Sequence, residues 1–259
     1  MVQSRLVVLL GISTLLGAVG SPPDVKEVKL LEEERRELLS LVHKTERHVV
    51  AEGGVVEQSI VKVYDFDLFG ERARGKALYF LNLLNDSDET LTEFPLQSDS
   101  EATFGFSDMN LTPLGHTLEK KREDAYVYHV ALEEPVPPGQ KLKILAKAVM
   151  GDELWYKKAH HRTLVKQGEP TGFQSKVAAR KGFAQTFLWQ LPKGCRVLGL
   201  APAPVEIWAE DDRLNVLFIF WSSKEAGELY DLKLEYLLPL VEGTADRADS
   251  GLPDQANGR

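Results

Sequence analysis

The sequence is poor in cysteine, and its charges are not balanced. Because Cys195 has no second cysteine to pair with, no disulfide forms within the chain, and we interpret it as a small buried apolar residue. Acidic residues number 39 against 31 Lys and Arg, a formal net charge of −8. This acidic excess favours solubility and argues against general binding to nucleic acid.

The common local signatures of enzymes are also absent: the sequence contains no G-x-S-x-G, H-E-x-x-H, C-x-x-C or EF-hand pattern. Residues 70–76 have the spacing of a phosphate-binding loop, but Ala77 replaces the hydroxyl residue that holds magnesium, and a predicted strand follows instead of a helix. His160 and His161 are adjacent, so on a strand they point to opposite faces and cannot hold one metal ion. The sequence therefore predicts no catalytic residue, no metal site and no cofactor.

The N-terminus has the three parts of a secretory signal peptide. Arg5 is basic, residues 6–16 are mostly apolar, and Ala18-Val19-Gly20 offers small residues for cleavage. The alternative is a membrane anchor, but this run is shorter than the roughly 20 residues that span a bilayer. We expect residues 1–20 to be a cleaved signal peptide, with no transmembrane segment left, and the protein to be secreted or periplasmic.

Residues 21–47 are predicted to form an N-terminal helical segment. Asp24 to Glu27 has the spacing of a capping box, and no Gly or Pro follows up to Arg47. The expected apolar face carries Val28, Leu31, Leu38 and Val42, and the expected charged surface carries Glu32, Glu33, Glu34, Arg35 and Arg36. Such a helix packs either against its own domain or, alternatively, against a partner or a second copy.

Residues 48–240 have the pattern of a β-rich domain, built as one unit or as two packed sub-sheets. Short runs of β-branched and aromatic residues alternate with turn clusters, and residues 55–69 and 77–84 are predicted to pair as a hairpin. Residues 230–238 alternate apolar and polar side chains, which is typical of a strand with one buried face. We therefore predict a mainly β fold, an antiparallel sandwich or saddle-like sheets preceded by one amphipathic helix. Residues 241–259 have few large apolar side chains and are predicted to be a disordered tail.

The β-rich body has a family resemblance. A signal peptide, a body joined by the turns at Pro137-Pro138-Gly139 and Pro192-Lys193-Gly194, and the closing alternating strand together resemble the noncatalytic N-terminal β domain of gluzincin-type zinc aminopeptidases. The zinc-binding H-E-x-x-H pattern of those enzymes is absent from this sequence, so no functional residue is carried over. The resemblance implies a β scaffold that binds or positions something.

One stretch is strongly basic in an otherwise acidic chain, and Glu169 is its only acidic residue between positions 157 and 196. These side chains either neutralise acidic neighbours such as Glu206 and Asp231, or bind an anionic partner together with nearby aromatic rings. The candidate anion-binding residues are Lys157, Lys158, Arg162, Lys166, Lys176, Arg180 and Lys181, with Trp155, Tyr156 and Phe173 as aromatic contacts.

Three functions compete on this sequence. The absence of catalytic signatures favours an exported noncatalytic binding or interaction module of the cell envelope or periplasm, whose partner is a protein or an anionic polymer. An alternative is a hydrolase acting on glycan or peptide through dispersed residues such as Asp65, Asp67, His160 and His161. A structural component of the envelope is the third.

Overall fold

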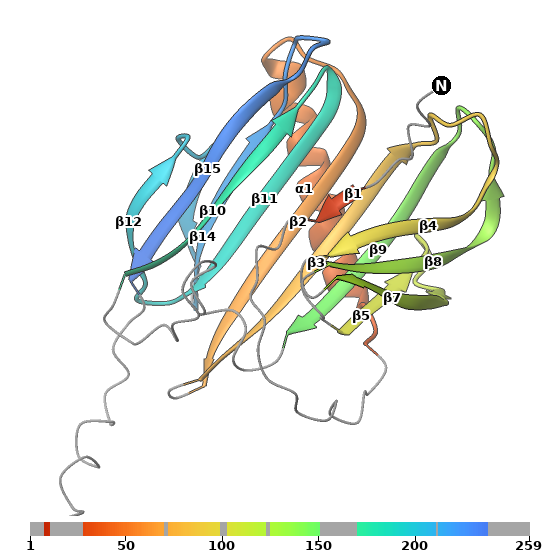
Figure 1. Cartoon of the computed structure of the whole chain (residues 1–259). Helices are drawn as coiled ribbons and strands as arrows, with labels where there is room; N and C mark the ends of the chain where they lie inside the picture. Colours follow the sequence, from red (N-terminus) through yellow and green to blue (C-terminus); the bar gives the residue numbers. More distant parts are fainter. Residues whose placement is uncertain are drawn as a thin grey trace, which may run out of the picture.

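The computed structural model describes residues 8–10, 28–69, 72–98, 103–122, 125–150, 170–210 and 212–237. These residues form a mainly β protein with the helix α1, as predicted from the sequence (Figure 1). In chain order the elements are β1 (Val8–Leu10), α1 (Glu32–Ala51), β2 (Val56–Phe69), β3 (Arg72–Leu84), β4 (Leu91–Ser98), β5 (Thr103–Ser107), β6 (Pro113–Leu114), β7 (His116–Arg122), β8 (Ala125–Val136), β9 (Lys141–Met150), β10 (Pro170–Ala179), β11 (Gly182–Pro192), β12 (Arg196–Ala201), β13 (Glu206–Ala209), β14 (Arg213–Phe220) and β15 (Glu228–Leu237).

The strands are arranged in a large sheet and two smaller ones. The large sheet has the order β13-β14-β11-β2-β3-β9-β5-β6, and the smaller ones have the orders β1-β4-β8-β7 and β10-β15-β12. The predicted hairpin is present, because β2 and β3 pair antiparallel from Ser59↔Asn82 to Phe69↔Arg72. Most pairs are antiparallel, but β2 and β11 pair in parallel at the middle of the large sheet.

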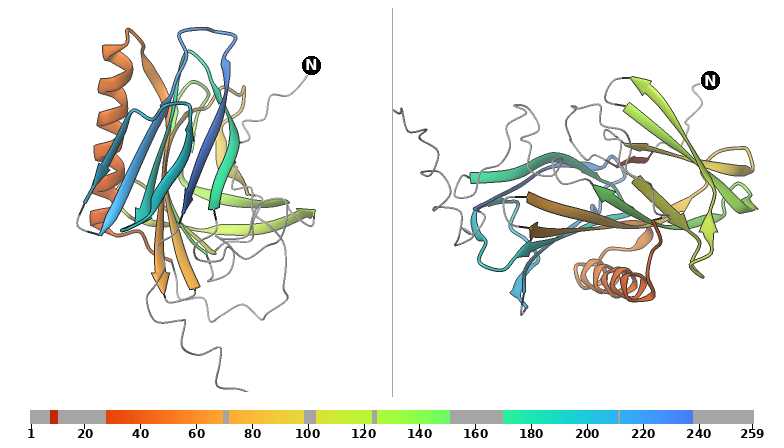
Figure 2. Two further views of the ribbon diagram at one scale, coloured as in Figure 1. Left: turned by 90° about the vertical axis from the view of Figure 1, so that its left-hand side faces the viewer. Right: turned by 90° about the horizontal axis from the view of Figure 1, so that it is seen from below.

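The large sheet lies between two different coverings. Figure 2 shows α1 on one face and the two smaller sheets on the other. The core beneath the smaller sheets joins all three sheets: Phe104 of β5 lies 4.6 Å from Tyr128 of β8, and Trp189 of β11 lies 4.9 Å from Phe173 of β10, measured between ring centroids. The core beneath α1 contains Leu38 of the helix and Val63 of β2. Both faces of the large sheet are therefore buried, which explains its apolar strands.

The helix differs from its prediction at both ends. It begins at Glu32 and continues to Ala51, whereas residues 28–31 are not helical and residues 24–27 lie outside the described ranges. The segment before the helix crosses the sheet at Gly105, where a Cβ atom would lie 1.8 Å from the carbonyl oxygen of Val28. Leu31, expected on the buried face, is 48% exposed, because it precedes the first helical turn. The helix packs against its own domain.

The described part of the N-terminal segment includes a short strand. Residues 8–10 of the expected signal peptide form β1, which pairs in parallel with β4. The other residues of that segment, and the tail predicted to be disordered, lie outside the described ranges. No helix in the described part of the chain is both long and apolar enough to cross a membrane.

Candidate functional site

A row of polar side chains crosses the large sheet beneath α1. Lys76, Asp65, Gln190, Asn215 and Trp208 are direct cross-strand neighbours on β3, β2, β11, β14 and β13. Neighbours in register lie on the same face of a sheet, so this polar row interrupts the apolar face that packs on the helix. Asp65 and Asn215 of this row are buried.

Ion pairs fasten the helix to this polar row. Glu34 of α1 is 4% exposed, and its Oε1 lies 2.8 Å from Lys147 Nζ and 3.4 Å from Lys76 Nζ. Lys76 Nζ lies 3.3 Å from Asp65 Oδ2, and Arg213 Nε lies 3.1 Å from Asp65 Oδ1. Glu34, expected on the exposed surface of the helix, is instead buried because these cations lie beneath it. Each buried charge has an opposite partner, which compensates part of the cost of burial.

Two neutral amides continue the polar row beyond these charges. Gln190 Nε2 donates a 2.7 Å hydrogen bond to Glu37 Oε1, and burial of Glu37 raises the pKa of that carboxyl although the hydrogen bond opposes the rise. Asn215 is wholly buried, and within the described part of the chain neither its amide oxygen nor its nitrogen has a hydrogen-bond partner. The polar row therefore positions the helix through ion pairs and a hydrogen bond. Asn215, by contrast, is a buried polar group that lowers stability.

This geometry bears on the carboxylate pair considered for catalysis. Asp65 is 8% exposed and is paired with both Lys76 and Arg213. Those two cations and the burial restrict its access to a substrate, whereas an acid or base must reach the reacting proton. The Asp67 side chain, His160 and His161 lie outside the described residues, so the dispersed hydrolase site stays a prediction.

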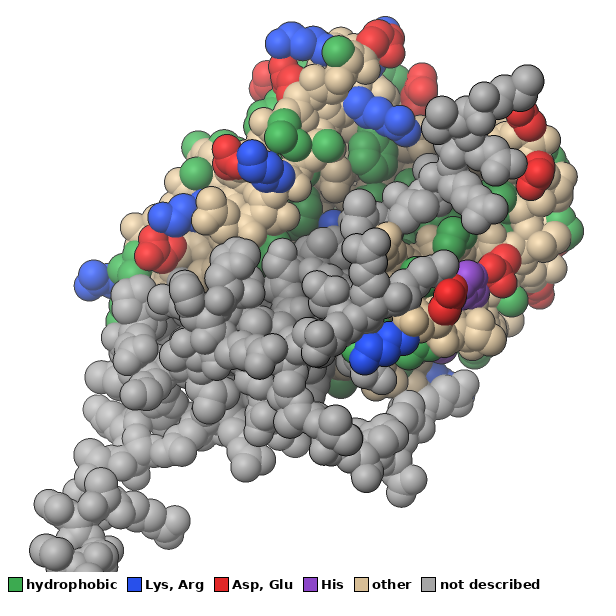
Figure 3. Space-filling model, viewed as in Figure 1, with side chains coloured by type: hydrophobic (Ala, Val, Ile, Leu, Met, Phe, Trp, Pro, Cys, Tyr) green, Lys and Arg blue, Asp and Glu red, His purple; other side chains and the backbone are tan. Residues whose placement is uncertain are grey.

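A second cluster lies on the surface of the β4-β8-β7 sheet. His129 of β8 stands between two carboxylates of the flanking strands: Nδ1 lies 2.6 Å from Glu93 Oε1, and Nε2 lies 3.0 Å from Glu119 Oε2. Figure 3 shows a histidine between acidic side chains on this side of the molecule. We call the solvent-facing side of this sheet the outer face, made up of Glu93, Pro95, Gln97, Thr117, Glu119, Val127, His129 and Ala131.

The two carboxylates make His129 easier to protonate. Hydrogen bonds with Glu119 and then Glu93 raise the pKa of its imidazole, and partial burial opposes the rise. A protonated ring donates from both nitrogens, which suits a position between two acceptors. The cluster therefore binds a proton, and its net charge becomes more negative when the proton leaves.

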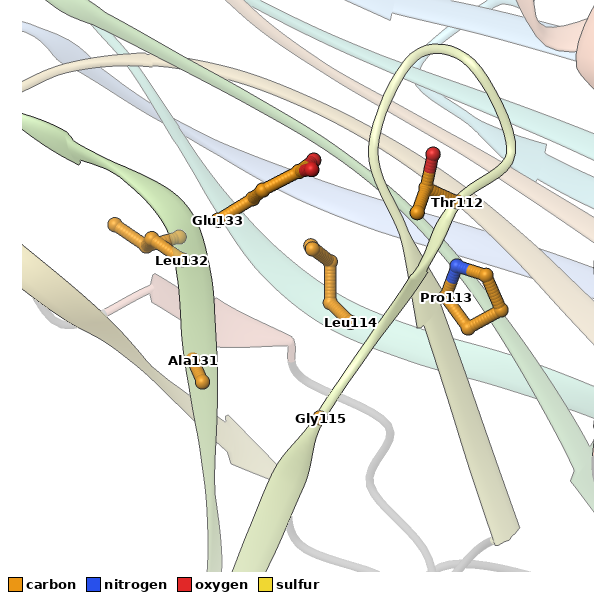
Figure 4. Close-up of a pocket in the computed structure, with 7 residues that line it drawn as sticks. All are labelled: Thr112, Pro113, Leu114, Gly115, Ala131, Leu132 and Glu133. Atoms are coloured by element: carbon orange, nitrogen blue, oxygen red, sulfur yellow. The ribbon is translucent and has the colours of Figure 1, made fainter.

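A shallow hollow adjoins the outer face. It has a volume of about 240 Å³ and is lined by Thr112, Pro113, Leu114, Gly115, Ala131, Leu132 and Glu133. In Figure 4, Glu133 extends from β8 toward the segment that carries Thr112 and Leu114. Glu93 is the cross-strand neighbour of Ala131, which lines the hollow, and Glu133 adds a further carboxylate there.

The described residues of the predicted anion-binding set each have a partner of their own. Lys181 Nζ lies 2.7 Å from Glu225 Oε1, and Lys176 Nζ lies 3.9 Å from Asp231 Oδ1. Arg180 lies over the ring of Phe183. Phe173 is half-buried against Trp189 in the core. Lys157, Lys158, Arg162, Lys166, Trp155 and Tyr156 lie outside the described residues, so the anion-binding set stays a prediction.

These pairings give a testable distinction within the basic stretch. Because Lys176 and Lys181 already have acidic neighbours, replacing both with Glu is expected to change retention on immobilised heparin only slightly. Replacing Lys157, Arg162 and Lys166 with Glu is expected to lower the eluting salt concentration clearly, since such contacts are screened by salt. Equal effects of the two variants, or no retention of the wild type at low salt, would remove the anion-binding hypothesis.

Cys195 is a partly buried free thiol. It lies at the turn after β11 and packs partly against the core of the three sheets. Burial raises the pKa of its thiol to about 12. The thiol is therefore protonated near neutral pH, as expected of a structural cysteine.

Comparisons with known proteins find a likeness among solved structures alone. No protein-family model matches the sequence, and no curated protein matches it. Among solved structures, the chain is similar to an M1 zinc metallopeptidase from Deinococcus radiodurans, with a TM-score of 0.39 and 11% sequence identity. The alignment covers 71% of this chain and 42% of the metallopeptidase, so the chain spans less than half of that protein's length. This weak likeness agrees in kind with the resemblance seen in the sequence, and it carries no argument about function.

Sequence reasoning missed both clusters. Glu93, Glu119 and His129 are isolated along the chain, and only the pairing of β8 with β4 and β7 brings them together. Strand parity is the signal in the sequence that points to His129. It lies between the apolar Tyr128 and Val130, so its side chain must project from the opposite face of the strand. Strand parity alone does not predict which residues of β4 and β7 lie beside His129, because that depends on the register of the strand pairs.

Proposed function

We propose that this chain is an exported, noncatalytic binding module. Its outer face binds a polypeptide partner that carries cationic side chains. The observation that carries the proposal is the Glu93–His129–Glu119 cluster, which spans three strands and faces solvent. The leader sequence supports export to the envelope or periplasm. Charged groups on the helix side, by contrast, are engaged in holding α1 to the large sheet.

The chemistry of the outer face favours a cationic ligand. Glu93 and Glu119 are about half exposed, so their carboxylates are accessible, and Glu133 lines the adjoining hollow. Complementary charge increases the rate of encounter and selects the partner. The hollow is a concave site that accommodates a side chain of the partner. A surface of this kind binds without needing a reacting group.

A cationic peptide tests this proposal. We expect a labelled peptide of four Lys-Thr repeats to bind, and a variant with Glu93→Gln, Glu119→Gln and Glu133→Gln to bind roughly three- to a hundredfold more weakly, since each of three exposed charge pairs contributes about 0.2–1 kcal/mol. Binding to the wild type is expected to strengthen as the pH rises through the pKa of His129, which lies above the ordinary 6.5, because the imidazole loses its positive charge. Fluorescence anisotropy measures both effects.

The matched control removes the same charge from another surface. Glu33, Glu46 and Glu52 are exposed on α1 and at its end, and their triple replacement with Gln leaves the outer face intact. If this control weakens binding as much as the outer-face variant does, the peptide responds only to net charge. In that case, or if the peptide does not bind, the outer face is not the binding surface.

A further inference from the structure

The β4 edge of the β4-β8-β7 sheet is occupied by a short additional strand. On one side β4 pairs antiparallel with β8, in the register Leu96↔Tyr128. On the other side it pairs in parallel with β1, in the register Val8↔Leu96, Leu9↔Gln97 and Leu10↔Ser98. The segment that occupies this edge belongs to the expected signal peptide.

Pro95 determines which backbone groups this edge presents. Proline has no N–H, so Pro95 cannot donate to its β8 neighbour His129 and must be a non-hydrogen-bonded position of that ladder. Gln97 is two residues further on, and therefore its N–H and C=O also point away from β8. In a parallel pairing these two groups bond to the residues on either side of the one opposite Gln97. Gln97 is thus the main contact of the accepting edge.

Removal of the leader would remove β1 and leave the outward N–H and C=O groups of Gln97 without that neighbouring strand. An exposed sheet edge is a template for another extended chain, and partner recognition by strand addition uses such edges. The edge of β4 from Phe94 to Ser98 carries no charged side chain, and the segment that occupies it, Val8-Leu9-Leu10, is apolar. The chemistry of the occupant is therefore that of an apolar, extended peptide.

We propose that β4 of the processed protein binds an extended apolar segment of the partner polypeptide as a parallel strand. This inference rests on the proposed function, and it deepens it by naming the bound segment. Continuing the register of β1 by three residues places a partner residue opposite Glu93. By strand parity, that residue projects on the outer face. The partner segment that fits best therefore has a basic residue opposite Glu93. Apolar residues follow it, and the third of these lies opposite Leu96.

The test uses a labelled peptide with the sequence of residues 3–11, QSRLVVLLG, which has this pattern. The full-length chain is compared with the protein processed by secretion, whose new N-terminus is established by mass spectrometry. We expect the peptide to bind the processed protein at least tenfold more tightly than the full-length chain, whose own leader competes. Hydrogen exchange of the Gln97 amide is expected to be slow in the full-length chain, fast after processing, and slow again with the peptide.

Two variants at one position separate strand addition from other binding. Gln97→Pro removes the outward N–H but leaves the β8 ladder intact, as Pro95 does naturally, and it is expected to abolish peptide binding without changing the melting temperature greatly. Gln97→Thr keeps the N–H and is expected to bind normally. Arg5→Glu in the peptide is expected to weaken binding about threefold or more by placing a like charge near Glu93.

Several results would overturn the inference. The first is that the Gln97→Pro variant binds the labelled peptide as well as the wild type does, and the second is that the processed protein does not bind it. The third is that residues 8–10 are retained after secretion. The fourth is dimerisation that Gln97→Pro abolishes, which would make a second copy of the chain the occupant of the edge. Failure of the inference is distinguishable from failure of the proposed function. If the Lys-Thr peptide still binds the outer face in the Gln97→Pro variant, the proposed function stands and only strand addition is wrong.

Discussion

Replacing Glu34 with alanine is expected to lower the free energy of unfolding by about 3 kcal/mol, because removing one partner of a buried ion pair leaves an uncompensated charge. Lys147 is only 14% exposed in its side chain and would keep its 3.2 Å hydrogen bond to the Lys29 carbonyl. The loss lies at the low end of the usual range of about 3–5 kcal/mol, because Lys76 is 37% exposed and retains Asp65. Urea denaturation followed by circular dichroism measures the change.

A neighbouring residue serves as the control for this prediction. Glu33 precedes Glu34 on the helix but is exposed, and Glu33→Ala is expected to change stability by less than about 0.5 kcal/mol. Glu34→Gln is expected to fall between the two, since its amide oxygen can still accept from the Leu31 N–H, a bond that Glu34 Oε2 makes at 2.9 Å. If Glu33→Ala and Glu34→Ala cost the same, the ion pairs beneath the helix do not hold it to the sheet.

Truncating Leu81 to alanine is expected to cost about 2–5 kcal/mol, the range for a buried leucine. Leu81 is 0% exposed and lies between its cross-strand neighbours Ile60 and Ile144 on the face that joins all three sheets. Its removal deletes apolar contacts and leaves a cavity that neighbouring strands cannot fill without bending. Thermal and chemical unfolding measure the loss of stability.

Leu229 of β15 is the matched position for Leu81. It is also a leucine on a strand, but it is 64% exposed, so Leu229→Ala is expected to change stability by less than about 0.5 kcal/mol. A small cost at Leu81 would show that the interior of the three sheets is loosely packed. A large cost at Leu229 would show that its side chain is covered in solution.

Local pattern predicted those parts of the fold that neighbouring residues determine. The β2–β3 hairpin is confirmed, and so is the alternation along β15, where Leu232, Leu234 and Tyr236 are buried. These features depend on residues close in sequence and on strand parity, which the sequence displays directly. The parallel pairing of β2 with β11 could not be predicted in this way, because it joins segments separated by more than a hundred residues.

The two clusters show the same limit at the level of single side chains. Helical periodicity places Glu34 on the same face as Leu31 and Leu38, but a charged residue at such a position gives no local sign that it is buried. Glu34 is buried only because Lys76 and Lys147 come from β3 and β9 to lie beneath it. In the same way, His129 acquires two carboxylate partners only when β4 and β7 pair with β8.

The sequence by itself determined the fold class, the apolar positions of the main strands and the presence of a helix before them, because periodicity and turn residues act over a few residues. Only the tertiary structure decided which charges are paired beneath α1, which are exposed on the outer face, and that β4 carries an accepting edge at Gln97. The physical reason is that the energy of a charge or a backbone amide depends on its partner and on its burial. Both are set by the register of strands that are distant in the chain.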